Sequence, residues 1–152
     1  MRDINKTKAQ LIEDLAELRQ QVAGLKAAGA ELACTEEAFR TALLEKNAIL
    51  DSLLGHVVYQ DTEMNILWAN RAACESVGLA REEVIGRTCY EVWHQRGDPC
   101  PDCPVAGAVR TGRPQGVETT TPDGRAWFIR GYPIRDASGD VTGAVEVTLE
   151  IT

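Results

Sequence analysis

The first fifty residues carry a seven-residue repeat of apolar side chains, and this repeat constrains the fold more than any other feature of the chain. No proline occurs between Ile4 and Leu53, and the only glycines there are Gly24 and Gly29. With Leu11 placed at position d of the heptad, seven of eight d positions are apolar, against four of seven a positions. The d positions are Ile4, Leu11, Leu18, Leu25, Leu32, Phe39, Lys46 and Leu53, and the a positions are Lys8, Leu15, Val22, Gly29, Glu36, Leu43 and Leu50. This pattern predicts a two-stranded coiled coil over residues 1–53, with a weak centre at Gly29 and Glu36.

The length of this repeat favours association with a second chain. Fifty helical residues make a rod of about 75 Å, whereas a domain of about 100 residues is only roughly 26 Å across. We therefore expect a homodimer held by a parallel coil, although the repeat alone leaves an antiparallel coil open. The alternative is one amphipathic helix, or a helical hairpin bent near residues 28–30, that packs on its own domain.

Composition restricts the partners and the compartment. The chain has 152 residues and a formal net charge of -7, so a phosphate backbone or an anionic membrane surface would be repelled. No apolar run approaches the roughly 18 residues of a membrane span, and the polar start lacks the apolar core of a secretory signal. We expect a cytoplasmic protein that binds neither nucleic acid nor membrane.

From residue 54 onward the pattern changes to short apolar runs separated by turns. It predicts two strands, three short helices that each end at a glycine, and three closing strands. The ranges are residues 56–61, 66–69, 71–77, 81–85, 104–110, 115–121, 125–135 and 141–151. The last strand alternates apolar residues with Glu146 and threonines, which is typical of a strand with one buried face. The whole order predicts an α+β domain, with helices on one side of an antiparallel sheet.

Several of these runs resemble the PAS family. The first half resembles it in a strand that ends in Ala-Asn, a helix, and a Glu-Glu-hydrophobic-Ile-Gly turn, at residues 65–72, 77–79 and 81–86. The second half resembles its three closing strands, at residues 123–125, 134–136, 139 and 141–143. The ending Glu150-Ile151-Thr152 is similar to the Asp-Ile-Thr signature of the family, with Glu in place of Asp. The coiled coil resembles the helical linkers that commonly precede such domains.

The resemblance implies a PAS sensory domain over residues 54–152, with a five-stranded antiparallel sheet and flanking helices that enclose a ligand pocket. It implies an input module of a signal-transduction protein rather than an enzyme. It also implies a downstream output domain, of the histidine kinase or cyclase type, in a longer protein of which this chain would be a sensor fragment.

A cysteine cluster distinguishes the chain from a generic member of that family. Cys74, Cys89, Cys100 and Cys103 fall within thirty residues, whereas Cys34 stands alone in the predicted coil. In a reducing compartment such a cluster indicates metal or redox chemistry more than a structural disulfide framework. The Cys100-x-x-Cys103 spacing lets two sulfur atoms share a metal or close one small ring. Cys103 also precedes the helix that starts at Pro104, where the helix dipole favours a thiolate.

Three hypotheses follow for this cluster. In the first hypothesis, Cys100 and Cys103 form a reversible disulfide, with Cys103 as the reactive thiolate. In the second, Cys89, Cys100 and Cys103 hold zinc or an iron–sulfur cluster, with Cys74 or His94 as the fourth ligand. In the third hypothesis the cysteines are structural, and the PAS domain only relays or dimerises.

Other cofactors and activities receive less support from the sequence. Pro104 follows Cys103, which excludes covalent c-type haem, while non-covalent haem through His94 or His56 stays open. A flavin or another small ligand could contact Trp68 and Trp127, which are otherwise expected in the core. A thiol–disulfide oxidoreductase is a remote alternative, because its Cys-x-x-Cys normally follows a strand in a βαβ unit.

Overall fold

The computed structural model describes residues 7–151. Ile4, the first predicted d position, and Thr152, the end of the family signature, lie outside the described residues. The element order is α1 (Lys8–Asp51), β1 (His56–Asp61), β2 (Ile66–Ala69), α2 (Arg71–Val77), α3 (Arg81–Val84), α4 (Cys89–His94), α5 (Pro104–Thr111), β3 (Gln115–Thr120), β4 (Ala126–Arg135) and β5 (Val141–Glu150). The chain divides into two compact units, one ending at Glu45 and the other beginning at Lys46.

The helix α1 is continuous over 44 residues. It begins with a capping box, in which the backbone N–H of Thr7 donates to Gln10 Oε1 (2.8 Å) and the N–H of Gln10 donates to Thr7 Oγ1 (3.3 Å). The weak centre of the heptad pattern does not interrupt the helix, so the hairpin bent near residues 28–30 is not adopted. Its apolar side chains at the a and d positions are exposed from Leu11 to Leu43.

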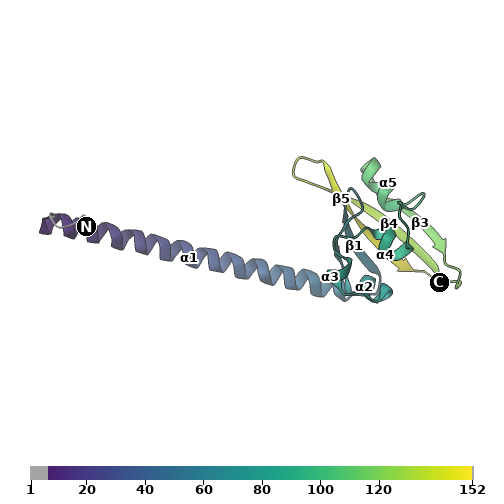
Figure 1. The fold of residues 1–152 in the computed structure, drawn as a ribbon, viewed down its shortest axis with the longest axis horizontal. Helices are drawn as coiled ribbons and strands as arrows, with labels where there is room; N and C mark the ends of the chain where they lie inside the picture. The colour runs from purple at the N-terminus through teal and green to yellow at the C-terminus, as the bar shows by residue number, and fades with distance from the viewer. Residues whose placement is uncertain (1–6, 152) are drawn as a thin grey trace. The chain divides into compact units, whose positions relative to one another are not determined.

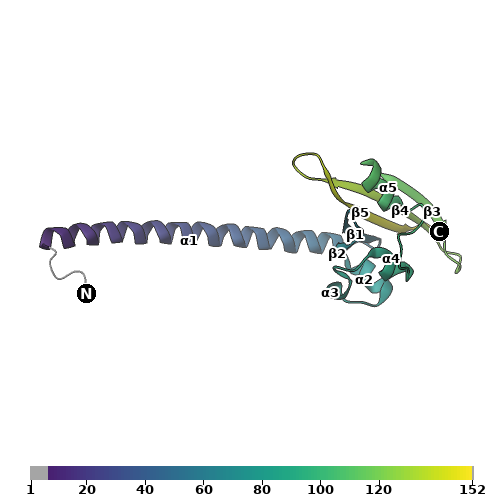
Figure 2. The same ribbon diagram turned by 45° about the horizontal axis from the view of Figure 1, so that its top comes forward.

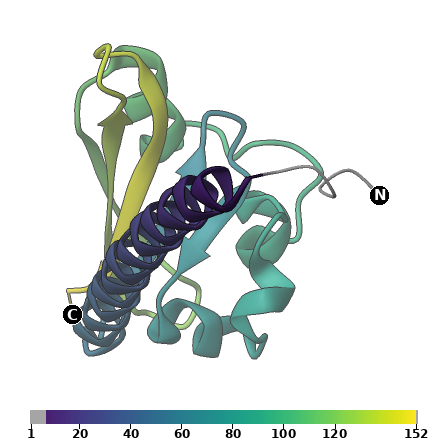
Figure 3. The ribbon, with the colours of Figure 1, turned by 90° about the vertical axis from the view of Figure 1, so that its left-hand side faces the viewer.

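The second unit is a five-stranded antiparallel sheet with short helices on one face (Figures 1 and 2). The strand order is β2-β1-β5-β4-β3, so the first and last strands of the domain pair at the centre. Figure 3 shows the helices of residues 71–94 gathered beside the strands. The fold class predicted from the sequence is confirmed, and the predicted strands and helices match within two residues at their ends.

Aspartates form two of the hairpin turns. Asp61 Oδ1 accepts from the backbone N–H groups of Glu63 and Asn65, at 2.8 and 2.9 Å. Asp136 Oδ1 accepts in the same way from Ser138 and Asp140, at 2.9 and 3.0 Å. Such side chains satisfy the turn backbone locally, which stabilises the two hairpin turns.

The strand β5 has the alternation that the sequence predicted, but its inner face is the polar one. Ala144, Glu146 and Thr148 lie on the face covered by helices, where Ala144 and Thr148 are buried. Val145 lies on the opposite face, in register with Tyr59 and Tyr132. A simple rule of apolar residues inward would therefore orient this strand the wrong way. As a consequence, a carboxyl group is placed inside the domain.

Candidate functional site

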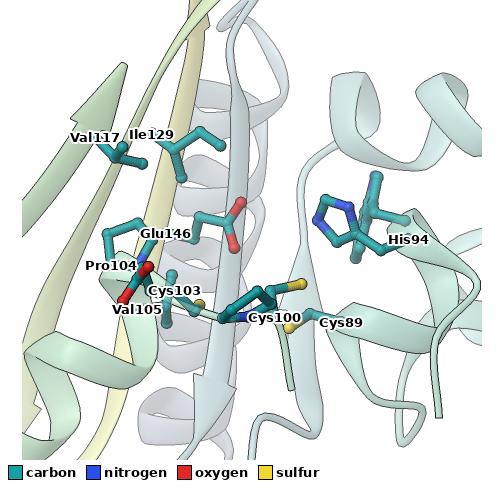
Figure 4. A pocket seen from close by; sticks show the side chains of 12 residues that line it. Cys89, His94, Cys100, Cys103, Pro104, Val105, Val117, Ile129 and Glu146 are labelled. Atoms are coloured by element: carbon teal, nitrogen blue, oxygen red, sulfur yellow. The ribbon is translucent and has the colours of Figure 1, made fainter. Parts of the chain in front are cut away.

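The candidate site is a cavity between the inner face of the sheet and the segment that contains α4 and the start of α5. Its volume is about 200 Å³. The residues that line it include Cys89, His94, Cys100, Cys103, Val117, Ile129 and Glu146. Figure 4 shows the Glu146 carboxyl group projecting from the sheet between Cys103 on one side and His94 on the other. The structure thus brings three of the four predicted cysteine ligands, and His94, to one cavity.

Local backbone geometry places the three cysteines. Cys89 is the first residue of α4, is buried, and donates its backbone N–H to Met64 O (3.1 Å). Between Cys100 and Cys103 the chain turns with Asp102 in the left-handed region, at a φ of 55°. Cys103 is the N-cap residue of α5 and Pro104 is its first residue, as the sequence predicted. The Cys103 side chain makes no capping hydrogen bond there. All five cysteines are free thiols.

The environment of Cys89 and Cys100 favours the neutral form of their thiols. Burial raises the pKa of the Cys89 thiol to about 12, with further contributions from the negative charges of Glu146, Cys103 and Cys100. Burial and the neighbouring Cys103 also raise the pKa of Cys100, which Arg96 partly offsets. Of the described residues, no lysine or arginine lines this cavity. The raised pKa of Cys89 and Cys100 is unlike that of an activated redox thiol, since Arg96 offsets the rise at Cys100 only in part.

Glu146 is the central polar group of the cavity, and sequence reasoning did not identify it. Its two oxygens accept hydrogen bonds from Gln60 Nε2 (3.0 Å) and Thr148 Oγ1 (2.9 Å). Burial raises the pKa of the Glu146 carboxyl, against the opposing effects of those two hydrogen bonds and of His94. The only sequence signal for Glu146 was its place on the polar face of β5. The alternation of polar and apolar residues revealed that face, but it was expected to face solvent.

A second cavity of about 180 Å³ adjoins the first. His94, Trp93, Ile129 and Glu146 line both cavities. The residues that line only the second are His56, Val58, Thr121, Trp127 and Thr148. The rings of His56 and Trp127 lie 5.8 Å apart between centroids, and burial lowers the pKa of His56. Trp127, a predicted ligand contact, is therefore in this second cavity rather than beside the thiols.

Cys74 and Trp68, two further predicted site residues, lie elsewhere. Cys74 is buried in α2 as part of the hydrophobic core, and burial raises the pKa of its thiol. Trp68 lies with Val145 and Leu50 around a cavity on the opposite face of the sheet. Arg81 lies 4.9 Å and Lys46 lies 5.3 Å from the centre of its ring. The structure thus separates both residues from the cysteine cavity.

No metal site is preformed within the described part of the chain. Within residues 7–151, no three His, Cys, Asp or Glu side chains are arranged to hold a metal ion. A metal bound by Cys89, Cys100 and Cys103 would have to draw their sulfur atoms together. The same part of the chain contains no helix that is long and apolar enough to cross a membrane.

Comparisons with known proteins identify the fold of the second unit. The model of a family described as a PAS fold matches residues 50–152. No curated protein matches the chain. The structure of VqmA bound to DPO is similar at 27% identity with a TM-score of 0.56, and the match covers 72% of this chain and 57% of VqmA.

Two further solved structures are similar. The Vibrio cholerae VqmA dimer, described as a DNA-binding LuxR-type receptor, has 26% identity and a TM-score of 0.56, over 72% of this chain and 51% of that one. A sensory-box sensor histidine kinase from Vibrio cholerae has 14% identity and a TM-score of 0.57, over 78% of this chain and 98% of that one. The latter likeness concerns the fold alone. The chain spans only about half the length of VqmA.

Proposed function

The chain belongs to the PAS-fold family, and from that premise we propose that it is a sensory input module that receives its stimulus at the cysteine cavity. The proposed stimulus is a thiophilic metal ion, such as zinc, or an iron–sulfur cluster. The family is sensory, so we propose no catalysis for this chain.

The observation that carries this proposal is the set of groups that line the cavity. Three thiols, the imidazole of His94 and the carboxyl of Glu146 line one cavity, and among residues 7–151 no lysine or arginine lines it. In that environment Cys89 and Cys100 favour their protonated forms, because the pKa of each thiol is raised. A soft cation removes this penalty, because it replaces the protons and supplies the missing positive charge.

The residues that would hold the ion are Cys89, Cys100 and Cys103, with His94 or Glu146 as the fourth ligand. Cys74 is not favoured as that ligand, because it belongs to α2 and does not line the cavity. Three sulfur ligands with one nitrogen or oxygen ligand suit tetrahedral zinc, and mixed ligation of an iron–sulfur cluster also occurs. The turn at residues 100–103 would have to close on α4 when the ion binds.

We propose that the change reaches α1 through the central strands. Glu146 of β5 is hydrogen-bonded to Gln60 of β1, and β1 is bonded to Asn70 through the Val57 backbone N–H (3.0 Å). Asn70 in turn donates to the carbonyl oxygen of Leu50 (3.0 Å), in the last turn of α1. A shift of Glu146 on metal binding would thus act on the end of the helix that we expect to dimerise.

The test is the metal content of protein reconstituted under anaerobic conditions. We expect wild-type protein to retain zinc, or to show a visible iron–sulfur absorption band, and Cys100→Ser to lose either one at least tenfold. Cys34→Ser is the matched control, because Cys34 is an exposed cysteine of α1, and it should bind as the wild type does. A colourless wild-type protein that retains no zinc would contradict the proposal, as would equal loss in Cys34→Ser.

A reversible disulfide between Cys100 and Cys103 is the second candidate. Asp102 lies in the left-handed region of backbone conformation, so the chain turns between Cys100 and Cys103. This turn favours a disulfide between them. The raised pKa of Cys100 opposes rapid attack by its thiolate. Intact-mass measurement after mild oxidation would detect the loss of a pair of hydrogen atoms, which Cys103→Ser should abolish.

The solved relatives bear on the partners. VqmA is described as a dimer and as a DNA-binding receptor, which supports a dimer of this chain. The expectation that this chain itself binds no nucleic acid, and the nature of its output domain, stay predictions.

A further inference from the structure

A groove on the outer face of the sheet, opposite to the cysteine cavity, is an interaction surface without an assigned partner. We propose that it docks a second copy of this chain, parallel to the first, and that Trp68 makes this pairing possible by drawing the Lys46 ammonium group out of the seam between the two helices. The metal site proposed above is separate, because no cysteine of the described residues lines this groove.

The groove has a volume of about 410 Å³ and is mainly apolar. Its lining consists of Lys46 and Leu50 of α1, Val57 and Tyr59 of β1, Trp68 of β2, Ile134 of β4 and Val145 of β5. Tyr59 is in register with both Trp68 and Val145, and Val145 is in register with Tyr132, so these side chains form one row across four strands. A contiguous apolar surface of this kind is typical of an interaction site.

The heptad register of α1 identifies what covers the groove. Lys46 is a d position and Leu50 is an a position of the repeat, and both belong to the second unit, which begins at Lys46. In a coiled coil, the residues at a and d face the partner helix. Because these two residues also line the groove, a helix that pairs with them lies over the groove. The occupant is therefore a second copy, through the corresponding turns of its own α1.

Lys46 would oppose this pairing if its side chain remained in the seam. In a parallel pair in register, two lysines meet at the same d position, and a charge there weakens a coiled coil. Lys46 Nζ instead lies 5.3 Å from the centre of the Trp68 ring, whose face attracts a cation. Lys46 makes no ion pair with the described residues, so the contact with Trp68 is what holds the ammonium group.

A neighbouring ion pair supports the Trp68 ring. Arg81 lies 4.9 Å from the ring centre. Its Nε donates to the carbonyl oxygen of Ala69 (2.7 Å), and its Nη2 donates to Asp51 Oδ1 (2.6 Å). Asp51 is the last residue of α1, so these contacts join the strand that carries Trp68 to the end of the helix that carries Lys46. Trp68 is thus a positioning residue for Lys46.

The test is the dissociation constant of the dimer, measured by sedimentation of the full chain over a dilution series. Val145→Glu places a charge in the middle of the apolar row and should weaken the dimer at least tenfold. Ile85→Glu is the matched control, because Ile85 is 44% exposed and does not line the groove, and it should change the constant less than twofold. If Val145→Glu proves unfolded by circular dichroism, Tyr59→Lys replaces it, with the same expectation.

A pair of variants isolates the role of Trp68. Trp68→Leu keeps an apolar side chain in the groove but releases the Lys46 ammonium group, so the dimer should weaken at least fivefold. The addition of Lys46→Leu to Trp68→Leu removes that charge and should restore at least the wild-type affinity. A loss that came only from disturbed packing around Trp68 would not be recovered in this way.

The orientation of the two copies is measured by energy transfer. Copies labelled at the N-terminal amine with a donor dye or an acceptor dye are mixed. A parallel pair brings the two labels together and gives efficient transfer. An antiparallel pair separates them by the length of the 44-residue helix, about 66 Å, and gives little transfer.

The inference is overturned by an unchanged dissociation constant in the folded groove variant, by equal weakening in Ile85→Glu, by failure of Lys46→Leu to restore Trp68→Leu, or by little energy transfer. A wild type that is monomeric throughout the dilution series would also reject it, together with the coiled coil. Metal content is measured on the same wild-type sample. Metal bound by a monomer would reject the docking surface alone, whereas a dimer with the expected variant responses and no metal would reject the proposed metal function alone.

Discussion

Asn70 makes all four of the hydrogen bonds that a side-chain amide can offer, and it is completely buried. Its Oδ1 accepts from the N–H groups of Val57 (3.0 Å) and Ala73 (3.1 Å), so it is also the N-cap of α2. Its Nδ2 donates to the carbonyl oxygens of Leu50 (3.0 Å) and Gly55 (2.9 Å). One residue thus connects the end of α1, the strand β1 and the helix α2.

We predict that Asn70→Asp destabilises the domain by about 3 kcal/mol, since two partly buried carbonyl groups lose their donor and face a carboxyl group instead. Urea unfolding followed by circular dichroism measures this change. Asn65→Ala is the control, because the Asn65 side chain makes a single hydrogen bond, from Nδ2 to Asp61 Oδ2 (2.9 Å), and should cost about 1 kcal/mol. A larger loss in Asn65→Ala than in Asn70→Asp would contradict the central role of Asn70.

At the scale of elements, the position of α5 depends on a close approach to β4. Gly131 lies under the first residues of α5, and a Cβ atom there would be 2.7 Å from Pro104 O and 2.7 Å from Val105 Cα. Both of these are backbone atoms, so a side chain could only be accommodated by moving the helix. Cys103 immediately precedes that helix, which means that the contact at Gly131 also positions one wall of the cysteine cavity.

We therefore expect Gly131→Ala to destabilise the domain by about 1–3 kcal/mol and to weaken metal binding. Gly97→Ala serves as the comparison, because nothing lies within 4 Å of a Cβ atom at that position, and its effect should stay within about 0.5 kcal/mol. The two variants are compared by the urea concentration at the midpoint of unfolding. Equal midpoints for the two variants would mean that α5 does not depend on this contact.

At the scale of the whole molecule, the exposed heptad side chains of α1 indicate a partner chain. Leu18 and Leu25 are 57% and 73% exposed, and Phe39 is 65% exposed. Long apolar stripes of this kind are covered in coiled coils by the same stripe of a second helix. The continuous helix supports the dimer that the sequence predicted, and the pairing itself stays a prediction.

Sedimentation at micromolar concentration tests it. The wild type should be a dimer, and Leu18→Glu with Leu25→Glu should be a monomer, because two charges would enter the apolar seam. Gln20→Glu adds a charge at an outer heptad position and should remain dimeric. A monomeric wild type would reject the coiled coil.

The elements of this protein could be predicted because local signals specify them. The heptad stripe predicted α1, the breaks between short apolar runs predicted the turns, and Pro104 marked the start of α5. These signals act between residues a few positions apart, so the linear order is sufficient to detect them. The convergence of Cys89 and Cys100 on one cavity was also expected, since the two lie close together in the chain.

The tertiary structure alone decided which side chains share the site. Cys74 was grouped with the other cysteines by its sequence position, but it lies in α2 and does not line their cavity. Glu146 was assigned to solvent by its alternation with valines, but the pairing of β5 between β1 and β4 turns it toward the thiols. The sequence of a strand shows which residues share a face, but not which face is buried. The elements that pack against the strand decide that. That choice rests on contacts between residues as far apart as Gln60 and Glu146, which no local pattern records.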